Sequence, residues 1–173
     1  TFGSGVNLTL VESGAGGAIS VANDLTMQGA GALTLSAGSG GVTLSADLAS
    51  DTGGITVDGT MTVSGAARTV TATGGTVAFN GAIESQAADR ALTVDAAGAD
   101  VVFGSTVGAT NTLAGMTVTA DTISLGGDVG TSGAQSYTGP VTLTADTTLA
   151  TTNDAVTLGT VNGTTAGAQD FAV

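Results

Sequence analysis

Acidic side chains that recur at one place in a repeated phrase are the first candidates for chemistry in this chain. Asp47, Asp121 and Asp146 each follow the alanine that closes a short apolar–hydroxyl–apolar phrase. Asp121 and Asp146 are predicted to stack about one repeat apart, where two carboxylates repel unless a cation or hydrogen bonds intervene. Because Ca²⁺ prefers oxygen ligands, these two residues are the candidate Ca²⁺ ligands, and no other cofactor is predicted. The alternative is that each aspartate caps a turn by accepting hydrogen bonds from backbone N–H groups.

The most polar stretch of the chain holds Glu84, Asp89 and Arg90. A protruding loop there is a candidate binding surface for a glycan or a receptor, and a paired acid could in principle act on a glycosidic bond. The alternative is a solvated loop with a local ion pair. The whole chain has two Arg, one Tyr and no Lys or His, which are too few groups for the groove of a glycan-cleaving β-helix. We therefore do not expect an enzyme.

Pairs of hydroxyl residues alternate with apolar residues and would point outward from a strand. Two hydroxyls per repeat on a flat face is how β-solenoid ice-binding proteins order water, so these pairs form a further candidate binding surface. The alternative is that exposed threonine simply suits strands. Asp95 interrupts the array, and ice-binding faces tolerate charge poorly. The candidate hydroxyl residues are Thr69, Thr71, Thr117, Thr119, Thr142 and Thr144.

The elements that would position these side chains follow from the repeated phrase itself. Its closing alanines are spaced by 24 to 26 residues, and a fixed period of that size signals a repeat architecture. Alternation with a period of two and many β-branched residues predicts strands, and no convincing helix pattern is present. The closing alanines are Ala46, Ala72, Ala96, Ala120 and Ala145.

A second and a third short apolar stretch follow each closing alanine, which predicts three short strands in each repeat. We therefore expect an all-β fold, a single-stranded parallel β-helix (β-solenoid) of about seven coils that stack at roughly 4.8 Å. Residues 1–173 are expected to form one continuous solenoid segment, cut from a longer repetitive chain. The predicted internal ladders are Val57, Phe79, Phe103 and Leu125 in one column, and Leu44, Val70, Val94, Val118 and Leu143 in another. The alternative fold is an antiparallel immunoglobulin-like β-sandwich, which usually has a large aromatic core residue and no repeat this short.

Charge and composition narrow the set of partners. The net charge is −12, with 14 Asp plus Glu against two Arg, which argues against nucleic acid as a partner because that affinity comes largely from Lys and Arg. The chain has no Cys, so stabilisation by disulfides is excluded. No stretch approaches the ~18 apolar residues of a membrane helix, so no membrane insertion of this segment is expected.

One stretch carries a resemblance to a known group of proteins. It reads Thr131-Ser132-Gly133-Ala134-Gln135-Ser136-Tyr137-Thr138-Gly139-Pro140-Val141-Thr142-Leu143 and continues into Asp146-Thr147-Thr148-Leu149, with a partial echo at Gly167-Ala168-Gln169-Asp170-Phe171. It resembles the repetitive passenger regions of large secreted bacterial adhesins, of the filamentous-haemagglutinin-like and autotransporter-passenger kinds. The resemblance implies a right-handed β-helix, export to the bacterial cell surface and a role in adhesion or biofilm. It brings no catalytic residues.

The expected function is therefore structural. The sequence and the resemblance together predict a rigid stalk or filament, secreted or on the cell surface, that serves adhesion, aggregation or a biofilm matrix. Open strand edges at the ends of a solenoid favour end-to-end self-association. An adhesin module that binds a glycan or a cell-surface receptor is the first alternative, and ice binding through the outward threonines is the second.

Overall fold

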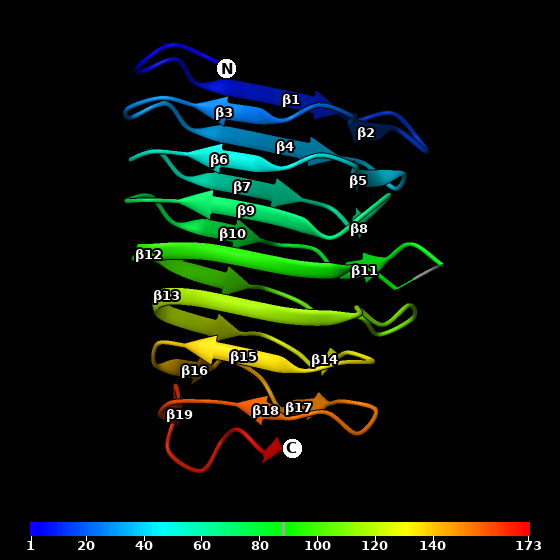
Figure 1. Cartoon of the computed structure of the whole chain (residues 1–173), viewed down its shortest axis with the longest axis vertical. Coiled ribbons are helices and arrows are strands. Elements are labelled where there is room, and N and C mark those ends of the chain that lie inside the picture. Colours follow the sequence, from blue (N-terminus) through cyan, green and yellow to red (C-terminus); the bar gives the residue numbers. More distant parts are fainter. Residues whose placement is uncertain (88) are drawn as a thin grey trace.

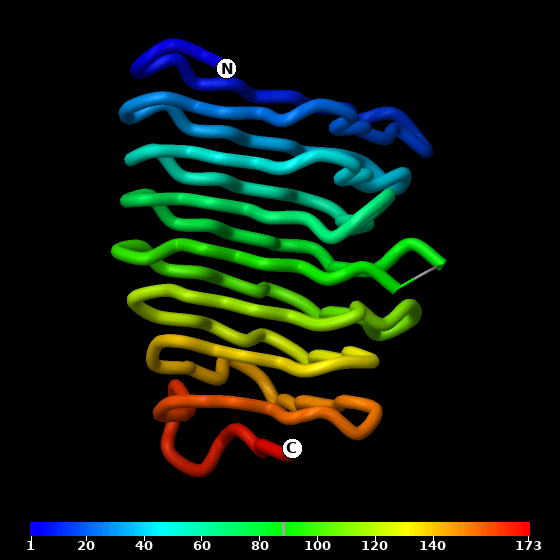
Figure 2. Tube along the Cα trace, viewed as in Figure 1, coloured from blue at the N-terminus to red at the C-terminus, as the bar shows by residue number. Residues whose placement is uncertain are grey.

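The computed structural model describes residues 1–87 and 89–173 as a β-solenoid in which the chain winds through about seven stacked coils. The trace runs from the N-terminal coil at one end of the molecule to the C-terminal segment at the other (Figure 2). In the described residues every element is a strand, so no helix there is long enough to cross a membrane. The predicted fold class is confirmed, and the antiparallel sandwich is excluded because the strand pairs are parallel.

Three faces of parallel strands surround one core (Figure 1). The first face holds β1 (Leu8–Glu12), β4 (Leu33–Ala37), β7 (Ile55–Asp58), β10 (Val77–Phe79), the second arms of β12 (Ala91–Phe103) and β13 (Gly115–Leu125), β16 (Val141–Leu143) and β19 (Val161–Gly163). The second face holds β3 (Leu25–Met27), β6 (Leu48–Ser50), β9 (Arg68–Ala72), the first arms of β12 and β13, β15 (Gln135–Thr138) and β18 (Val156–Thr157). The third face holds β2 (Ala18–Val21), β5 (Gly41–Leu44), β8 (Met61–Val63), β11 (Ile83–Ser85), β14 (Val129–Gly130), β17 (Thr147–Ala150) and β20 (Phe171–Ala172).

Strands form here because alternate residues point into the core and out of it. In β7, Ile55 and Val57 are fully buried while Thr56 between them is partly exposed. Each coil alone could not bury its apolar side, but the stacked coils cover each other and pair their backbones on all three faces. Within one coil the chain passes from the third face to the second, and then to the first.

The first predicted ladder is confirmed. Val57, Phe79, Phe103 and Leu125 are register partners in four successive coils of the first face. The two phenyl rings stack with centroids 5.4 Å apart and planes 14° apart. This aromatic pair gives the middle of the thin core its largest side chains.

The second predicted ladder is only partly correct. Val70, Val94 and Val118 are partners on the second face, as predicted. Leu44 instead pairs on the third face, and Leu143 pairs with Leu125 on the first face.

The second ladder is only partly correct because the repeated phrase occurs in strands of all three faces, and not in strands of one face alone. Register partners are 25 residues apart at Leu8 and Leu33, 22 at Leu33 and Ile55, and only 18 at Ile123 and Val141. The closing alanines divide in the same way. Ala96 pairs with Ala120 at the corner between the second and first faces, whereas Ala46 and Ala145 lie at other corners.

One corner column is made of glycine because two coils approach closely there. A Cβ atom at Gly53 would lie 2.0 Å from the carbonyl oxygen of Gly31, and one at Gly75 would lie 2.2 Å from that of Gly53. No side chain fits at those distances, so glycine is required by the backbone of the neighbouring coil.

Candidate functional site

The three predicted aspartates lie at three different corners of the solenoid. Asp47 lies between β5 and β6, Asp121 lies in β13 between its two arms, and Asp146 lies between β16 and β17. The prediction that Asp121 and Asp146 stack is therefore wrong, because the phrase that precedes them belongs to different faces. Among residues 1–87 and 89–173, no three acidic side chains lie close enough together to hold a metal ion.

The acidic side chains instead join neighbouring coils, and we call them corner carboxylates. Asp24 Oδ1 accepts a hydrogen bond from the backbone N–H of Asp47 at 3.0 Å, and Asp47 Oδ1 accepts one from Thr69 at 2.9 Å. Asp146 Oδ1 accepts one from Asp170 at 2.9 Å. The corner carboxylates that bond a backbone N–H of an adjacent coil are Asp24, Asp47, Asp51, Asp128 and Asp146, and Glu84 makes the same kind of bond from within β11.

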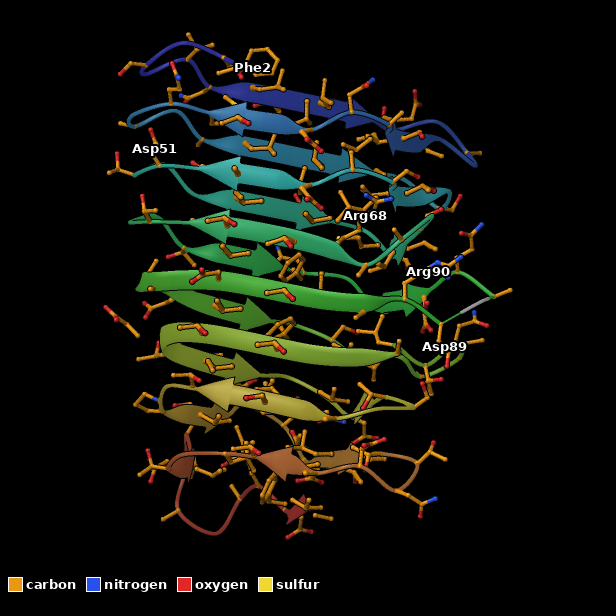
Figure 3. The ribbon with its side chains drawn as sticks, in the orientation of Figure 1. Phe2, Asp51, Arg68, Asp89 and Arg90 are labelled. Atoms are coloured by element: carbon orange, nitrogen blue, oxygen red, sulfur yellow. The ribbon has the colours of Figure 1, made fainter. Side chains whose placement is uncertain are left out.

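These bonds give a structural role to six of the 14 acidic residues. A backbone N–H that leaves a ladder at a corner needs a partner, and a carboxylate is a stronger acceptor than a neutral group. The turn-capping alternative is therefore what the structure shows at Asp47 and Asp146. Asp51 lies on the opposite side of the molecule from the two arginines (Figure 3).

Glu84, in β11, and Asp89, after it, both contact the loop of the next coil. Glu84 Oε2 accepts hydrogen bonds from the backbone N–H groups of Asn111 at 2.7 Å and Thr110 at 3.1 Å. Asp89 Oδ2 lies 3.4 Å from the hydroxyl of Thr112, which donates to it. The two acids thus hold one loop, and their geometry is that of a structural contact between coils.

Arg90 begins the return from this stretch to the second face. Its backbone N–H donates to the hydroxyl of Ser85 at 2.7 Å, while its side-chain Nε is buried and has no hydrogen-bond partner among residues 1–87 and 89–173. Arg68, one coil earlier, donates from Nε to the carbonyl oxygen of Ser64 at 3.0 Å.

The predicted hydroxyl array exists on the second face, but with different members. Thr69, Thr93, Thr117 and Ser136 form one outward column, and Thr71, Asp95, Thr119 and Thr138 form a second. Thr142 lies on the first face, between Ser124 and Asn162. Thr144 follows β16, and its hydroxyl donates to the carbonyl oxygen of Leu125 at 3.1 Å. Thr142 and Thr144 therefore do not belong to the array.

A groove on the third face was not predicted from the sequence. Two adjoining depressions of about 300 and 320 Å³ share Asp128 and Thr148 and together form what we call the third-face groove. Its lining residues are Val107, Gly108, Ala109, Asp128, Val129, Gly130, Asp146, Thr147, Thr148, Ala150, Asp170, Phe171 and Ala172.

The groove arises where the outward column of the third face loses its side chains. In the earlier coils this column is Ser20, Thr43, Thr62 and Glu84. In the later coils it continues as Gly108, Gly130 and Ala150. Gly108 has a φ of +66°, and a Cβ there would lie 2.2 Å from the carbonyl oxygen of Gly130. The sequence alone does not predict this change from hydroxyl residues to glycine, because the register that places these residues in one column is known only from the structure.

A buried polar cluster replaces the apolar ladder below Met116. Gln135 is fully buried, and its Nε2 donates to the carbonyl oxygens of Ala150 at 2.9 Å and Val129 at 3.2 Å. The hydroxyl of Tyr137 donates to Gln135 Oε1 at 2.9 Å. The cluster joins the second face to the third across the core, and burial raises the pKa of Tyr137 well above its usual value.

Comparisons of the chain with protein-family models, with curated proteins and with solved structures found no match.

Proposed function

We propose that this chain is a rigid structural segment of a secreted or cell-surface bacterial protein, acting as a stalk or filament in adhesion, aggregation or a biofilm matrix. The observation that carries the proposal is the continuity of the coil-to-coil contact. Parallel ladders run along three faces, from β1 to β19 on the first face alone. The resemblance to secreted adhesin passengers supports the location and the biological role.

Hydrogen bonds at the corners also join neighbouring coils along the axis of the solenoid. Corner carboxylates bond the backbone of an adjacent coil at 2.7 to 3.0 Å, as Asp128 does with Thr148 and Asp24 with Asp47. Because these bonds and the ladders both lie along the long axis, a load on the axis is shared among many bonds at each coil boundary. A spacer of this kind needs length and stiffness rather than a catalytic group.

The geometry supports this function better than a discrete site at Glu84, Asp89 and Arg90. Both carboxylates of that stretch bond the loop of the next coil. One of the two hydroxyl columns of the second face is interrupted by the charge of Asp95, which favours the structural interpretation of those threonines over ice binding.

The test is the removal of whole coils, guided by the register. Residues 55–76 make one coil, because Ile55 pairs with Val77, and residues 101–122 make another, because Val101 pairs with Ile123. Each deletion should leave a folded protein that is shorter by about 4.8 Å. Deletion of residues 55–65 alone is the matched control, because it removes the first-face strand β7 and the third-face strand β8 and joins two strands of the second face, which should unfold the segment.

The readouts are display of the full protein on its cell, measured by protease accessibility, and the adhesion or aggregation of those cells. A stalk tolerates the loss of either coil, with both activities retained. If one whole-coil deletion leaves the protein folded and displayed but abolishes adhesion, that coil holds a discrete binding site and the proposed function is wrong.

A further inference from the structure

The only Lys, Arg or His side chains of this chain are two arginines at one corner. Arg68 begins β9 and Arg90 precedes β12, so both lie where the chain passes from the third face to the second, in adjacent coils. Both lie on the side of the molecule where the loops after β8 and β11 project (Figure 3). We call this pair the arginine corner, and it is the one cationic feature of a chain with a net charge of −12.

The third-face groove has the chemistry that recognises a guanidinium group. Asp128, Asp146 and Asp170 line it, and a carboxylate can accept two parallel N–H bonds from one guanidinium. Phe171, which is 38% exposed, lines the same groove, and a guanidinium stacks well on an aromatic face. The outward positions at the floor of the groove are Gly108 and Gly130, which carry no side chains, while Val107 and Val129 beside them are buried in the core; the floor therefore leaves room for a planar group.

The carboxylates of the groove are held in place by the fold. Asp128 Oδ1 accepts from the backbone N–H of Thr148 at 2.7 Å, and Asp146 Oδ1 accepts from that of Asp170 at 2.9 Å. Each bond fixes its side chain through one oxygen atom. An arginine that enters the groove would therefore meet acceptors that are already oriented, which lowers the entropy lost on binding.

From this charge complementarity we propose that the third-face groove binds the arginine corner of a second copy of this chain, so that two solenoids pair side by side. The inference rests on the proposed function and deepens it, because it supplies the contact by which stalks aggregate laterally. The groove and the arginine corner border the same face, so a two-fold axis between antiparallel copies makes the contact twice.

The pairing depends on ionic strength in a characteristic way. Two chains of net charge −12 repel each other when salt is low, and screening at about 0.1 M salt shortens that repulsion to roughly 10 Å. Exposed ion pairs are themselves weak, so high salt weakens the contact again. Association is expected to be strongest at intermediate salt.

The experiment is sedimentation velocity of the whole 173-residue chain over a range of salt and protein concentrations. The unaltered chain should show a dimer whose population passes through a maximum with salt. The double variant Arg68→Gln/Arg90→Gln should associate about tenfold more weakly or not at all. Its matched control is Thr138→Glu/Thr157→Glu, which changes the net charge by the same amount on the second face and should still associate.

A charge exchange makes the test specific. Asp170→Arg alters the groove without removing a corner carboxylate bond, because only the backbone N–H of Asp170 takes part in one. This variant should lose self-association, while Asp154→Arg, an exposed residue outside the groove, should not. An equimolar mixture of Asp170→Arg with Arg68→Glu/Arg90→Glu should recover the dimer.

Three results would overturn the proposal: a monomer at every salt concentration, association that survives the loss of both arginines, or no recovery in the mixture. Circular dichroism of each variant separates loss of contact from loss of fold. A monomeric chain that still tolerates whole-coil deletion would refute lateral pairing and leave the stalk function standing.

Discussion

Replacement of Gly53 by alanine should be among the most damaging small changes in this protein. The added Cβ would lie 2.0 Å from the carbonyl oxygen of Gly31, 2.4 Å from its carbonyl carbon and 2.8 Å from the backbone nitrogen of Ala32. All three are backbone atoms of the preceding coil, so no flexible side chain can move aside. Ordinary contact begins at 3.4 Å, and the two coils must separate locally to reach it.

That separation acts on bonds that join the same coils. The backbone N–H of Leu33 donates to the carbonyl oxygen of Gly54 at 2.9 Å, and the hydroxyl of Ser50 lies between the carbonyl oxygens of Gly53 at 2.7 Å and Gly31 at 3.1 Å, to either of which it can donate. Overpacking of a tight site costs about 1–3 kcal/mol, and a weakened hydrogen bond costs about 1 kcal/mol more. We therefore expect Gly53→Ala to lower the free energy of unfolding by about 2–4 kcal/mol.

The assay is urea unfolding followed by circular dichroism, with Gly3→Ala as the matched control. A Cβ at Gly3 meets nothing within 4 Å, so the control should be neutral or slightly stabilising, because alanine has a less flexible unfolded state. If Gly53→Ala changes the unfolding free energy by less than 0.5 kcal/mol, a value within the ordinary range for surface substitutions, the close stacking of these coils is refuted.

Three further predictions concern the core and the corners. Phe103→Ala should cost about 3–5 kcal/mol in urea unfolding, because it removes a buried ring stacked on Phe79; a loss below 1 kcal/mol would contradict the ladder. Asp47→Ala should cost about 1–2 kcal/mol by leaving the Thr69 N–H without its acceptor, and hydrogen exchange at Thr69 should accelerate, whereas unchanged exchange would argue against the corner bond. Tyr137 is the one tyrosine of the chain, so absorbance at 295 nm reports its ionisation alone. Because burial raises its pKa in the folded state, the protein should lose stability as the pH rises above about 10, the value for the unfolded chain; ionisation at that pH with the fold intact would contradict the buried position.

The fold could be predicted because strand patterning and repetition are local properties. Alternation at Ile55 and Val57, and a recurring short phrase, were enough to indicate stacked parallel strands, and the ladder through Phe79 and Phe103 followed from them. The face of the solenoid to which each copy of the phrase belongs could not be predicted in the same way. The phrase fits any of three faces, and the coil length that assigns it to one depends on corner geometry, as the short 18-residue step to Val141 shows.

The predictions of the candidate sites were right or wrong according to whether each residue was assigned to the correct face. Thr69, Thr71, Thr117 and Thr119 lie on one face, as predicted, in the first and third of three successive coils. Asp121 and Asp146 were wrongly paired because a phase error moved them to different corners. The third-face groove was missed because it is made by glycines such as Gly108 and Gly130, whose importance depends on their register rather than on their type.

Single-molecule stretching with magnetic tweezers tests most directly whether the stacked coils form a rigid rod that resists extension along its axis. The chain would be held by its two ends between reference domains of known unfolding force. We predict no extension at low force, followed by discrete steps in which each coil of 22 residues, the spacing of Ile55 and Val77, releases about 70–80 Å of chain. Smooth extension at low force, without steps, would contradict the claim.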